Sequence, residues 1–156
     1  KGIYRPLEGV TGEKAVILGA GGAAAAAVYA VSMRGYTPVI LNRSPDRAIH
    51  LARKTGAETG KLEDIGKFSP DLIINTTPVG MGKDPNIPIP PQVLKPEMKV
   101  FDLVYTPKDT PLLQAALAAG CSVIPGTEMF IHQLAEQFRI LTGIEAPVSR
   151  IREMLG

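Results

Sequence analysis

The sequence has no tryptophan, a single cysteine, and aromatic residues at only 5% of its positions. Cys121 cannot form a disulfide within the chain, which argues against a disulfide-stabilised secreted domain and favours a reducing, cytoplasmic compartment. Neither sign of charge predominates, because 17 basic residues face 15 acidic ones. Since the basic residues form no continuous stripe, we expect no nucleic-acid partner.

Long hydrophobic runs and clustered metal ligands are missing as well. The longest apolar stretch near the start is the alanine-rich segment 23–32, far shorter than the roughly 20 residues that span a bilayer. The two histidines and the cysteine are dispersed along the chain, which is not the spacing of a metal site. We therefore expect neither a membrane partner nor a bound metal.

The residues that are present favour one compact α/β domain. Apolar residues make up 45% of the 156 positions, which is enough for a single hydrophobic core. Short apolar runs alternate with helical stretches, a pattern typical of a doubly wound, mainly parallel sheet flanked by helices, the Rossmann-like architecture. The predicted strands are residues 14–18, 38–41, 57–59, 71–75, 99–104 and 122–124. The predicted helices are residues 23–34, 45–55, 111–120, 128–142 and 148–155, with a short helical turn at 62–65. Ser44 and Thr110, each followed by a proline, are the residues expected to begin the second and third of these helices. Five prolines predict an irregular loop before the strand at 99–104: Pro85, Pro88, Pro90, Pro91 and Pro96.

The first residues carry no periodic pattern. We expect residues 1–12 to be an irregular lead-in or linker, and residues 13–156 to form the domain. Because the chain begins with Lys rather than Met, we also expect it to be part of a longer protein with residues missing upstream.

A glycine-rich turn joins the first predicted strand to the first predicted helix. In a dinucleotide-binding turn the first glycine permits a tight bend, the second lets the backbone approach the pyrophosphate, and a third small residue lets the helix pack on the strand. Free amides and the positive end of the helix dipole then hold the phosphates. A turn between a strand and a helix can also be rich in glycine when no ligand binds there. The motif alone is therefore compatible with a purely structural turn. The turn consists of Gly19, Ala20, Gly21, Gly22 and Ala23, followed by Ala24.

The end of the second predicted strand carries Asn42, Arg43 and Ser44, with Arg47 one helical turn later. An NAD-binding domain of this kind usually has an acidic residue here, which accepts hydrogen bonds from the adenine ribose. Residues 42–44 include no acid, and a planar guanidinium can bind a 2′-phosphate through two hydrogen bonds. We therefore expect NADP rather than NAD. The alternative is that both arginines only lie on a solvated helix start.

Three further segments follow predicted strands at the same edge of the sheet. Ligands bind beyond the carboxyl ends of parallel strands, so these segments are candidates to contact a cofactor and a substrate. Local backbone capping, a strand terminus and an amphipathic core helix would produce the same residue types, so both interpretations stay open. The segments are the polar loop 75–81, the strand end 102–105, and the helix that carries Gly126, Met129 and Gln133.

Taken in order, these residues resemble the shikimate dehydrogenase family, including the dehydrogenase half of bifunctional dehydroquinate dehydratase/shikimate dehydrogenases. The resemblance covers nearly the whole chain, and the stretch 128–131 is similar to the bifunctional subgroup in particular. A plant-type precursor would place the protein in a plastid. The matching residues are 19–23, 42–44, Arg47, 75–81, Asp102, Tyr105, Pro107, Thr110, Leu112, Leu113, Gly126, Met129 and Gln133.

The resemblance implies an oxidoreductase of the shikimate pathway of aromatic amino acid biosynthesis, which reversibly reduces 3-dehydroshikimate to shikimate with NADPH. It implies that residues 19–23 hold the pyrophosphate, that residues 42–44 with Arg47 hold the 2′-phosphate, and that Tyr105 and Gln133 reach the substrate. The nicotinamide half is expected to contact Thr76, Leu103, Gly126 and Met129.

The family's general acid/base pair, a lysine and an aspartate, lies in an N-terminal substrate-binding domain. We therefore expect no catalytic residue in this chain, and NADP(H) binding without turnover. Asp102 is not that aspartate, and its expected part is structural or cleft-lining.

Two other interpretations remain. The chain could be a stand-alone NADP-binding or regulatory module without chemistry. Alternatively, the substrate could differ, since quinate dehydrogenases and glutamyl-tRNA reductases share the glycine turn. The loop 75–81 and the elements from Tyr105 to Gln133 favour shikimate.

Overall fold

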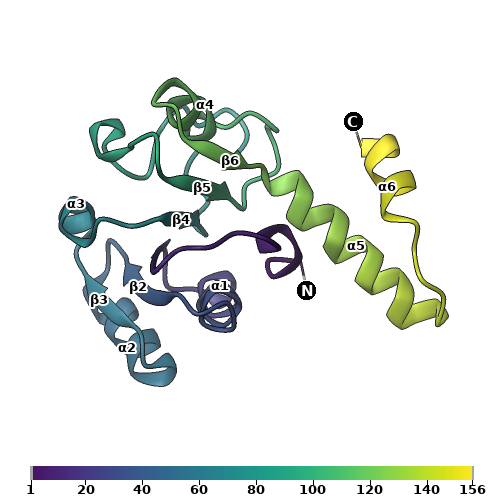
Figure 1. The fold of residues 1–156 in the computed structure, drawn as a ribbon, viewed down its shortest axis with the longest axis horizontal. Helices are drawn as coiled ribbons and strands as arrows, with labels where there is room; N and C mark the ends of the chain where they lie inside the picture. The colour runs from purple at the N-terminus through teal and green to yellow at the C-terminus, as the bar shows by residue number, and fades with distance from the viewer. Residues whose placement is uncertain (1, 156) are drawn as a thin grey trace.

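Six parallel strands form one sheet within residues 2–155, the part of the chain that the computed structural model describes (Figure 1). Across the sheet the strands follow the order β3-β2-β1-β4-β5-β6. The chain first adds β2 and β3 on one side of β1, and then crosses over to add β4, β5 and β6 on the other side. The strand order therefore reverses between β1 and β4. This confirms the predicted doubly wound, Rossmann-like α/β fold.

The strands are β1 (Lys14–Leu18), β2 (Thr37–Leu41), β3 (Glu58–Gly60), β4 (Leu72–Asn75), β5 (Lys99–Asp102) and β6 (Ser122–Ile124). The α-helices are α1 (Gly22–Ser32), α2 (Pro45–Thr55), α3 (Ile65–Phe68), α4 (Pro111–Ala118), α5 (Gly126–Thr142) and α6 (Val148–Leu155). Short 3-10 helices are η1 (Arg5–Leu7), η2 (Leu62–Asp64) and η3 (Pro91–Val93).

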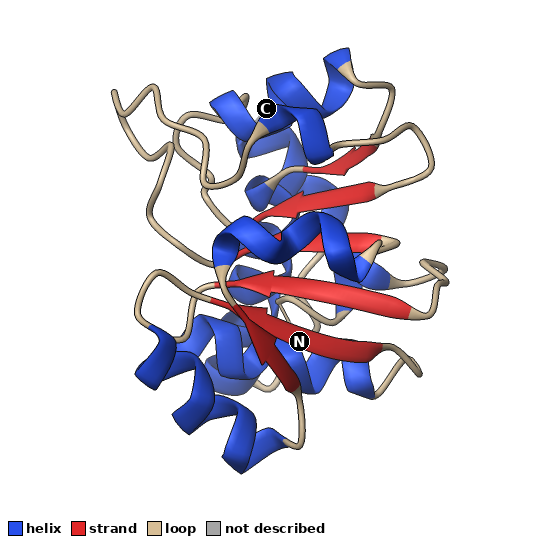
Figure 2. Ribbon diagram, turned by 90° about the vertical axis from the view of Figure 1, so that its left-hand side faces the viewer, coloured by secondary structure: helices blue, strands red, loops and turns tan. Residues whose placement is uncertain are grey.

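Each face of the sheet has its own apolar layer. Successive strand residues point to opposite faces, so Ala15 and Ile17 of β1 pack with α1 and α2. Their neighbours Val16 and Leu18 pack on the other face with α3 and α4. Both faces are therefore covered, which explains why the central strands have apolar interiors without alternation. Figure 2 shows the helices on either side of the strands, whose arrows point the same way.

The predicted elements are confirmed, with shifts of at most three residues at their ends. The helix expected from residue 128 begins at Gly126, and the strand expected to reach residue 104 ends at Asp102. A Cβ atom at Gly126 would collide with the backbone of Leu103 and Val104, so the start of α5 lies directly on the segment after β5. Local sequence carries no signal for this contact, because it joins residues far apart in the chain.

The prediction of an irregular lead-in is wrong for residues 5–7, which form η1. Leu7 is completely buried in the layer beneath α1. Arg34 fixes the same segment, because its Nη2 donates to the Tyr4 carbonyl oxygen at 3.1 Å and its guanidinium lies over the Tyr4 ring. The sequence did not reveal that Leu7 and Val10 are buried, because their burial depends on packing against segments far along the chain.

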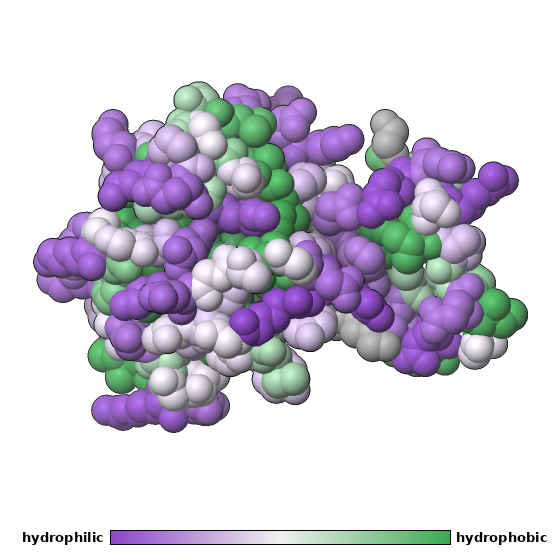
Figure 3. Space-filling model, in the orientation of Figure 1, coloured by the Kyte–Doolittle hydropathy of each residue, from purple (hydrophilic) through white to green (hydrophobic). Residues whose placement is uncertain are grey.

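Helices α5 and α6 extend away from the sheet as a projection, visible on the right of Figures 1 and 3. A two-point ion pair between Arg152 and Glu128, with a shortest distance of 2.7 Å, ties α6 back to α5. Several apolar side chains of the projection are exposed: the exposed fraction is 84% for Leu141 and 81% for Met154. Among residues 2–155, no helix combines the length and the apolar character needed to cross a bilayer.

Asp71 joins the amino ends of β4 and β1, and this contact predicts a pH-dependent stability. Its Oδ2 accepts hydrogen bonds from the amides of Lys14 at 2.9 Å and Glu13 at 2.8 Å. These bonds favour the carboxylate and lower the pKa of Asp71. Since the folded pKa lies below the unfolded value of about 3.9, the stabilisation is present above that pH and is lost as the pH falls through the folded pKa.

We therefore expect Asp71→Ala to lower the free energy of unfolding by about 1 kcal/mol at pH 7. Urea unfolding at pH 7 and pH 3 measures this, and the difference from the wild type should shrink at the lower pH. Asp71→Asn keeps one acceptor oxygen, so its free energy of unfolding at pH 7 is expected to lie between those of the wild type and Asp71→Ala. An equal difference at both pH values would contradict the assignment.

Candidate functional site

The candidate site lies at the carboxyl ends of β1 and β4, where the strand order reverses. In open parallel sheets the connections diverge at this point and leave a crevice for ligands. Neighbouring strand ends are tied together there: Gly19 N donates to Leu41 O at 2.8 Å, and Thr76 N donates to Leu18 O at 3.0 Å. The site is therefore built on connected, rigid strand ends.

The glycines of the turn after β1 have different structural requirements. Gly19 has a φ of +112°, and a Cβ there would lie 2.5 Å from Thr76 Oγ1, so the fold itself requires glycine. Gly21 has an ordinary φ of −96°, and a Cβ there would meet no atom within 4 Å. Gly22 is equally open. The fold does not need glycine at position 21, so its absent side chain leaves room beside the start of α1.

The start of α1 presents unpaired amides to this open space. The first amides of an α-helix have no intrahelical acceptor. The first turn of α1 contains no acidic residue, and its N-cap Gly21 has no side chain to accept from these amides. This end of the helix therefore favours an anion.

A cavity of about 600 Å³, here called the arginine cavity, adjoins the beginning of the turn. Arg43 and Arg47 line it from the β2–α2 connection, and both side chains are exposed. Asn42 Nδ2 donates to Ser44 O at 3.0 Å and bends this connection. Ser44 is the N-cap of α2, as predicted, but its side chain makes no capping bond. The remaining lining residues are Gly19, Leu41, Asn42, Leu62, Thr77, Pro78, Val79, Asp84, Asn86, Ile87 and Pro88.

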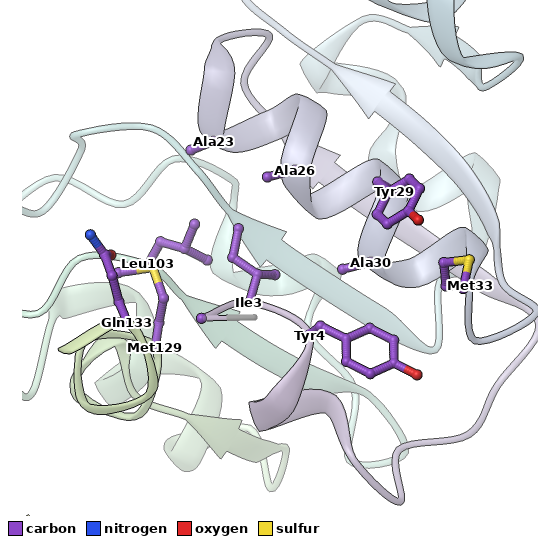
Figure 4. Close-up of a pocket in the computed structure, with 11 residues that line it drawn as sticks. Ile3, Tyr4, Ala23, Ala26, Tyr29, Ala30, Met33, Leu103, Met129 and Gln133 are labelled. Carbon is purple, nitrogen blue, oxygen red and sulfur yellow. The ribbon is translucent and has the colours of Figure 1, made fainter. Parts of the chain in front are cut away.

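An apolar groove of about 770 Å³ lies beside the other end of the turn, between α1 and α5. Figure 4 shows Leu103, Met129 and Gln133 together at one end. Ala23 of the glycine turn lies near them, whereas Tyr29 and Met33 line the far end. The other lining residues are Gly2, Ile3, Tyr4, Ala26 and Ala30.

The two residues predicted to reach the substrate are Gln133, on α5, and Tyr105, in the segment after β5. Gln133 lines the apolar groove. Tyr105 is 47% exposed, and its ring stacks on Phe130 with the centroids 4.8 Å apart and the planes 9° apart. Met129, Phe130 and Gln133 follow helical spacing, so one side of α5 carries the groove and the support for Tyr105.

Asp102 is a buried structural residue, in agreement with its expected part. Its Oδ1 accepts from Asn75 Nδ2 at 2.9 Å and from Val104 N at 3.1 Å, and its Oδ2 accepts from Thr110 Oγ1 at 2.6 Å. Burial raises the pKa of the Asp102 carboxyl, and these hydrogen bonds oppose the rise. With no exposed surface, the carboxylate cannot contact a ligand.

The structure brings the predicted residues together in two groups around the turn. Asn42, Arg43 and Arg47 meet Gly19 at the arginine cavity, and Leu103, Met129 and Gln133 meet Ala23 at the groove. Thr76 packs against the start of the turn: its Oγ1 donates to the carbonyl oxygen of Leu18, the last residue of β1, at 2.7 Å, and leaves no room for a Cβ at Gly19. Other predicted residues line neither cavity: Ala20, Gly21, Gly22, Ser44, Thr76, Tyr105 and Gly126.

The residue types in the sequence did not predict which segment forms the far wall of the arginine cavity. That wall is formed by residues 84–88 of the proline-rich loop, where Asp84 accepts from Gly80 N at 3.0 Å and from Asn86 N at 3.1 Å. The prolines predicted only that the segment is irregular. No signal in the sequence could tell that it folds back over the strand ends. Within residues 2–155, no group of three or more His, Cys, Asp or Glu side chains could hold a metal ion.

Two family models match the chain. Residues 4–78 match the model described as Shikimate / quinate 5-dehydrogenase, and residues 126–155 match the Shikimate 5'-dehydrogenase C-terminal domain. Shikimate dehydrogenase (NADP(+)) of Archaeoglobus fulgidus is 38% identical over 162 residues, which cover 97% of this chain and 60% of that protein.

Solved structures agree with these matches. The shikimate 5-dehydrogenase of Thermus thermophilus, in complex with NADP(H) and shikimate, has a TM-score of 0.89 at 35% identity over 99% of this chain and 59% of its own. Quinate dehydrogenase from Corynebacterium glutamicum, in complex with NAD, has a TM-score of 0.88 at 33% identity over 97% of this chain and 59% of its own. The chain thus spans about 60% of the length of these relatives. Its sequence and fold together make it a member of the shikimate dehydrogenase family.

Proposed function

We propose that this chain binds NADP(H) across the strand-order reversal between β1 and β4. One observation carries the proposal: the glycine turn borders the arginine cavity at Gly19 and the apolar groove at Ala23. A dinucleotide has two different halves joined by a pyrophosphate, so it suits a turn with open amides flanked by two different cavities. The Thermus thermophilus relative with NADP(H) bound supports this choice of ligand.

The residues of the arginine cavity fit the adenosine half of NADP. Arg43 and Arg47 supply positive charge for a 2′-phosphate, and residues 42–44 include no carboxylate to repel it. Asn42 and Ser44 complete this group, with a free Ser44 hydroxyl as a further donor. The pyrophosphate is assigned to the turn formed by Gly19, Ala20, Gly21, Gly22 and Ala23.

The residues at the near end of the groove fit the nicotinamide half. Leu103 and Met129 offer an apolar wall for a flat ring, and Thr76 and Gly126 lie on the adjoining strand end and helix start. Tyr105 and Gln133 are assigned to the substrate. When bound, the nicotinamide supplies hydride transfer, and this chain's own residues bind and orient it.

The proposed reaction of the whole protein is the reversible reduction of 3-dehydroshikimate to shikimate with NADPH. Its general acid and base would come from an N-terminal substrate-binding domain. Residues 1–12, of which Leu7 packs in the core of this domain, would connect it to the nucleotide-binding domain formed by residues 13–156. The apolar groove and the exposed apolar side chains of the projection support a further domain that covers them. The proposed location is the cytoplasm, or a plastid for a plant-type precursor.

The isolated chain is therefore expected to bind NADPH and to lack turnover. NADPH fluorescence titration measures the binding, and NADP reduction with shikimate in excess measures the activity. Addition of the chain to a substrate-binding domain from the same protein should restore activity. Turnover by the chain alone would refute the claim that essential residues lie elsewhere.

The second candidate function is a dehydrogenase that accepts quinate as well as shikimate. The quinate dehydrogenase matches this fold as closely as the shikimate dehydrogenase does, with TM-scores of 0.88 and 0.89. Parallel assays of shikimate and quinate with the substrate-binding domain present distinguish the two. A stand-alone regulatory module predicts NADP binding but no activity in any combination.

A further inference from the structure

We propose that Asn75, Asp102 and Thr110 form a positioning unit, the strand-end network, that holds the turn after β4 in its nucleotide-binding conformation. This inference rests on the proposed NADP(H) binding at the same strand ends. None of the three residues has exposed surface, so they act through the segments they hold rather than by touching a ligand.

The charge on Asp102 determines how Asn75 is oriented. A carboxylate can only accept hydrogen bonds, so Asn75 must turn its Nδ2 toward Asp102 Oδ1, at 2.9 Å. Its own Oδ1 then faces the following turn. A neutral amide at position 102 could present either a donor or an acceptor to Asn75, which would leave only the neutral contacts with Thr77 N and Val79 O to orient it.

The oriented Asn75 oxygen fixes the next residues. It accepts from Thr77 N at 3.0 Å and from Thr77 Oγ1 at 2.7 Å, and Thr77 Oγ1 in turn accepts from Val79 N at 3.3 Å. Thr77 and Val79 both line the arginine cavity. A chain of hydrogen bonds therefore runs from a buried carboxylate to the wall of the proposed nucleotide site.

The same turn contacts the glycine bend. Thr76 Oγ1 donates to Leu18 O at 2.7 Å and leaves no space for a Cβ at Gly19. A flipped Asn75 amide would move the turn against this contact. The expected result is a misplaced pyrophosphate and adenosine site, even though the sheet remains intact.

The carboxylate also holds the segment after β5. Val104 N donates to Asp102 Oδ1, and Thr110 donates to Oδ2 while its Oγ1 accepts from Leu113 N as the N-cap of α4. The loops themselves are linked by Gly82 N, which donates to Thr106 O at 2.8 Å. One buried charge thus sets the relative position of two loops at the site.

A buried carboxylate costs free energy to desolvate, so stability alone does not explain its presence here. If the network were merely structural, substitutions in it would lower nucleotide affinity only to the extent that they unfold the chain. A positioning network changes affinity in the folded chain. The two roles are separable by measuring binding and stability on the same variants.

The test uses the chain itself, NADPH fluorescence titration, and urea unfolding to set conditions in which every variant is folded. We expect Asp102→Asn and Thr110→Val to weaken NADPH affinity at least about 5-fold. Thr110→Ser keeps the hydroxyl and should bind within about 2-fold of the wild type. Leu112→Val trims a buried side chain of the same helix that lines neither cavity, and should lose stability without losing affinity.

Amide hydrogen exchange without nucleotide gives a second, independent measurement. In Asp102→Asn the amides of Thr77 and Val79 should exchange at least about 10-fold faster, with no change for β2. A wild-type chain that binds no NADPH would refute the proposed function, and the exchange rates would still decide the positioning role. Unchanged affinity together with unchanged exchange in Asp102→Asn, or an equal affinity loss in Leu112→Val, would overturn the inference.

Discussion

NADP is expected to bind this chain at least about 10-fold more tightly than NAD, a difference of about 1.4 kcal/mol, and Arg43→Glu is expected to erase that difference. The two nucleotides differ only in the 2′-phosphate. Arg43 lines the arginine cavity from the end of β2, where a guanidinium can bind a phosphate through two hydrogen bonds. Charge reversal replaces this attraction with repulsion that acts on NADP alone.

Calorimetric titration of both nucleotides at one ionic strength measures the effect, since exposed charges are screened by salt. Arg53→Glu is the matched control, because it makes the same charge change in the last turn of α2, where the side chain is exposed and lines neither cavity. It should leave the preference for NADP intact.

Equal affinity of the wild type for NADP and NAD would end the 2′-phosphate assignment. The test has a real alternative outcome, because the quinate dehydrogenase from Corynebacterium glutamicum was solved in complex with NAD on nearly the same fold. Arg47→Glu alone should reduce the preference as well, since Arg47 shares the cavity.

The second large effect is expected from a pair of substitutions in the glycine turn. Gly21→Ser should weaken NADPH binding at least about 10-fold and leave the free energy of unfolding unchanged. The fold has space for the new side chain, the φ of −96° suits it, and serine is a favoured N-cap residue. The loss of affinity would come from blocked access to the start of α1.

Gly19→Ala, by contrast, should act on stability and lower the free energy of unfolding by about 2 kcal/mol. Its φ of +112° disfavours a side chain, and the new Cβ would lie 2.5 Å from Thr76 Oγ1. Urea unfolding and NADPH titration on both variants separate the two roles. If Gly21→Ser bound NADPH as well as the wild type does, the pyrophosphate would not lie at the turn.

The local sequence determined the elements that depend on short-range chemistry. Apolar runs predicted β1, β2 and β4, because strands covered on both faces exclude polar residues. Glycines after β1 predicted the sharp bend, and Thr110 followed by Pro111 predicted the start of α4, whose N-cap bond the structure contains. The resemblance to shikimate dehydrogenases, carried by residues spread along the chain, is confirmed by the family matches.

Only the tertiary structure decided which distant segments meet at the site. The proline-rich loop around Asp84 closes the arginine cavity, residues 2–4 line the apolar groove, and Phe130 supports Tyr105. None of these contacts has a local periodicity or a cap residue that would reveal it. The sequence by itself thus determined the strands, the glycine bend and the charged end of β2. The tertiary structure decided how Asp102 is buried and what it holds, because burial and hydrogen-bond partners depend on residues brought together from separate strands.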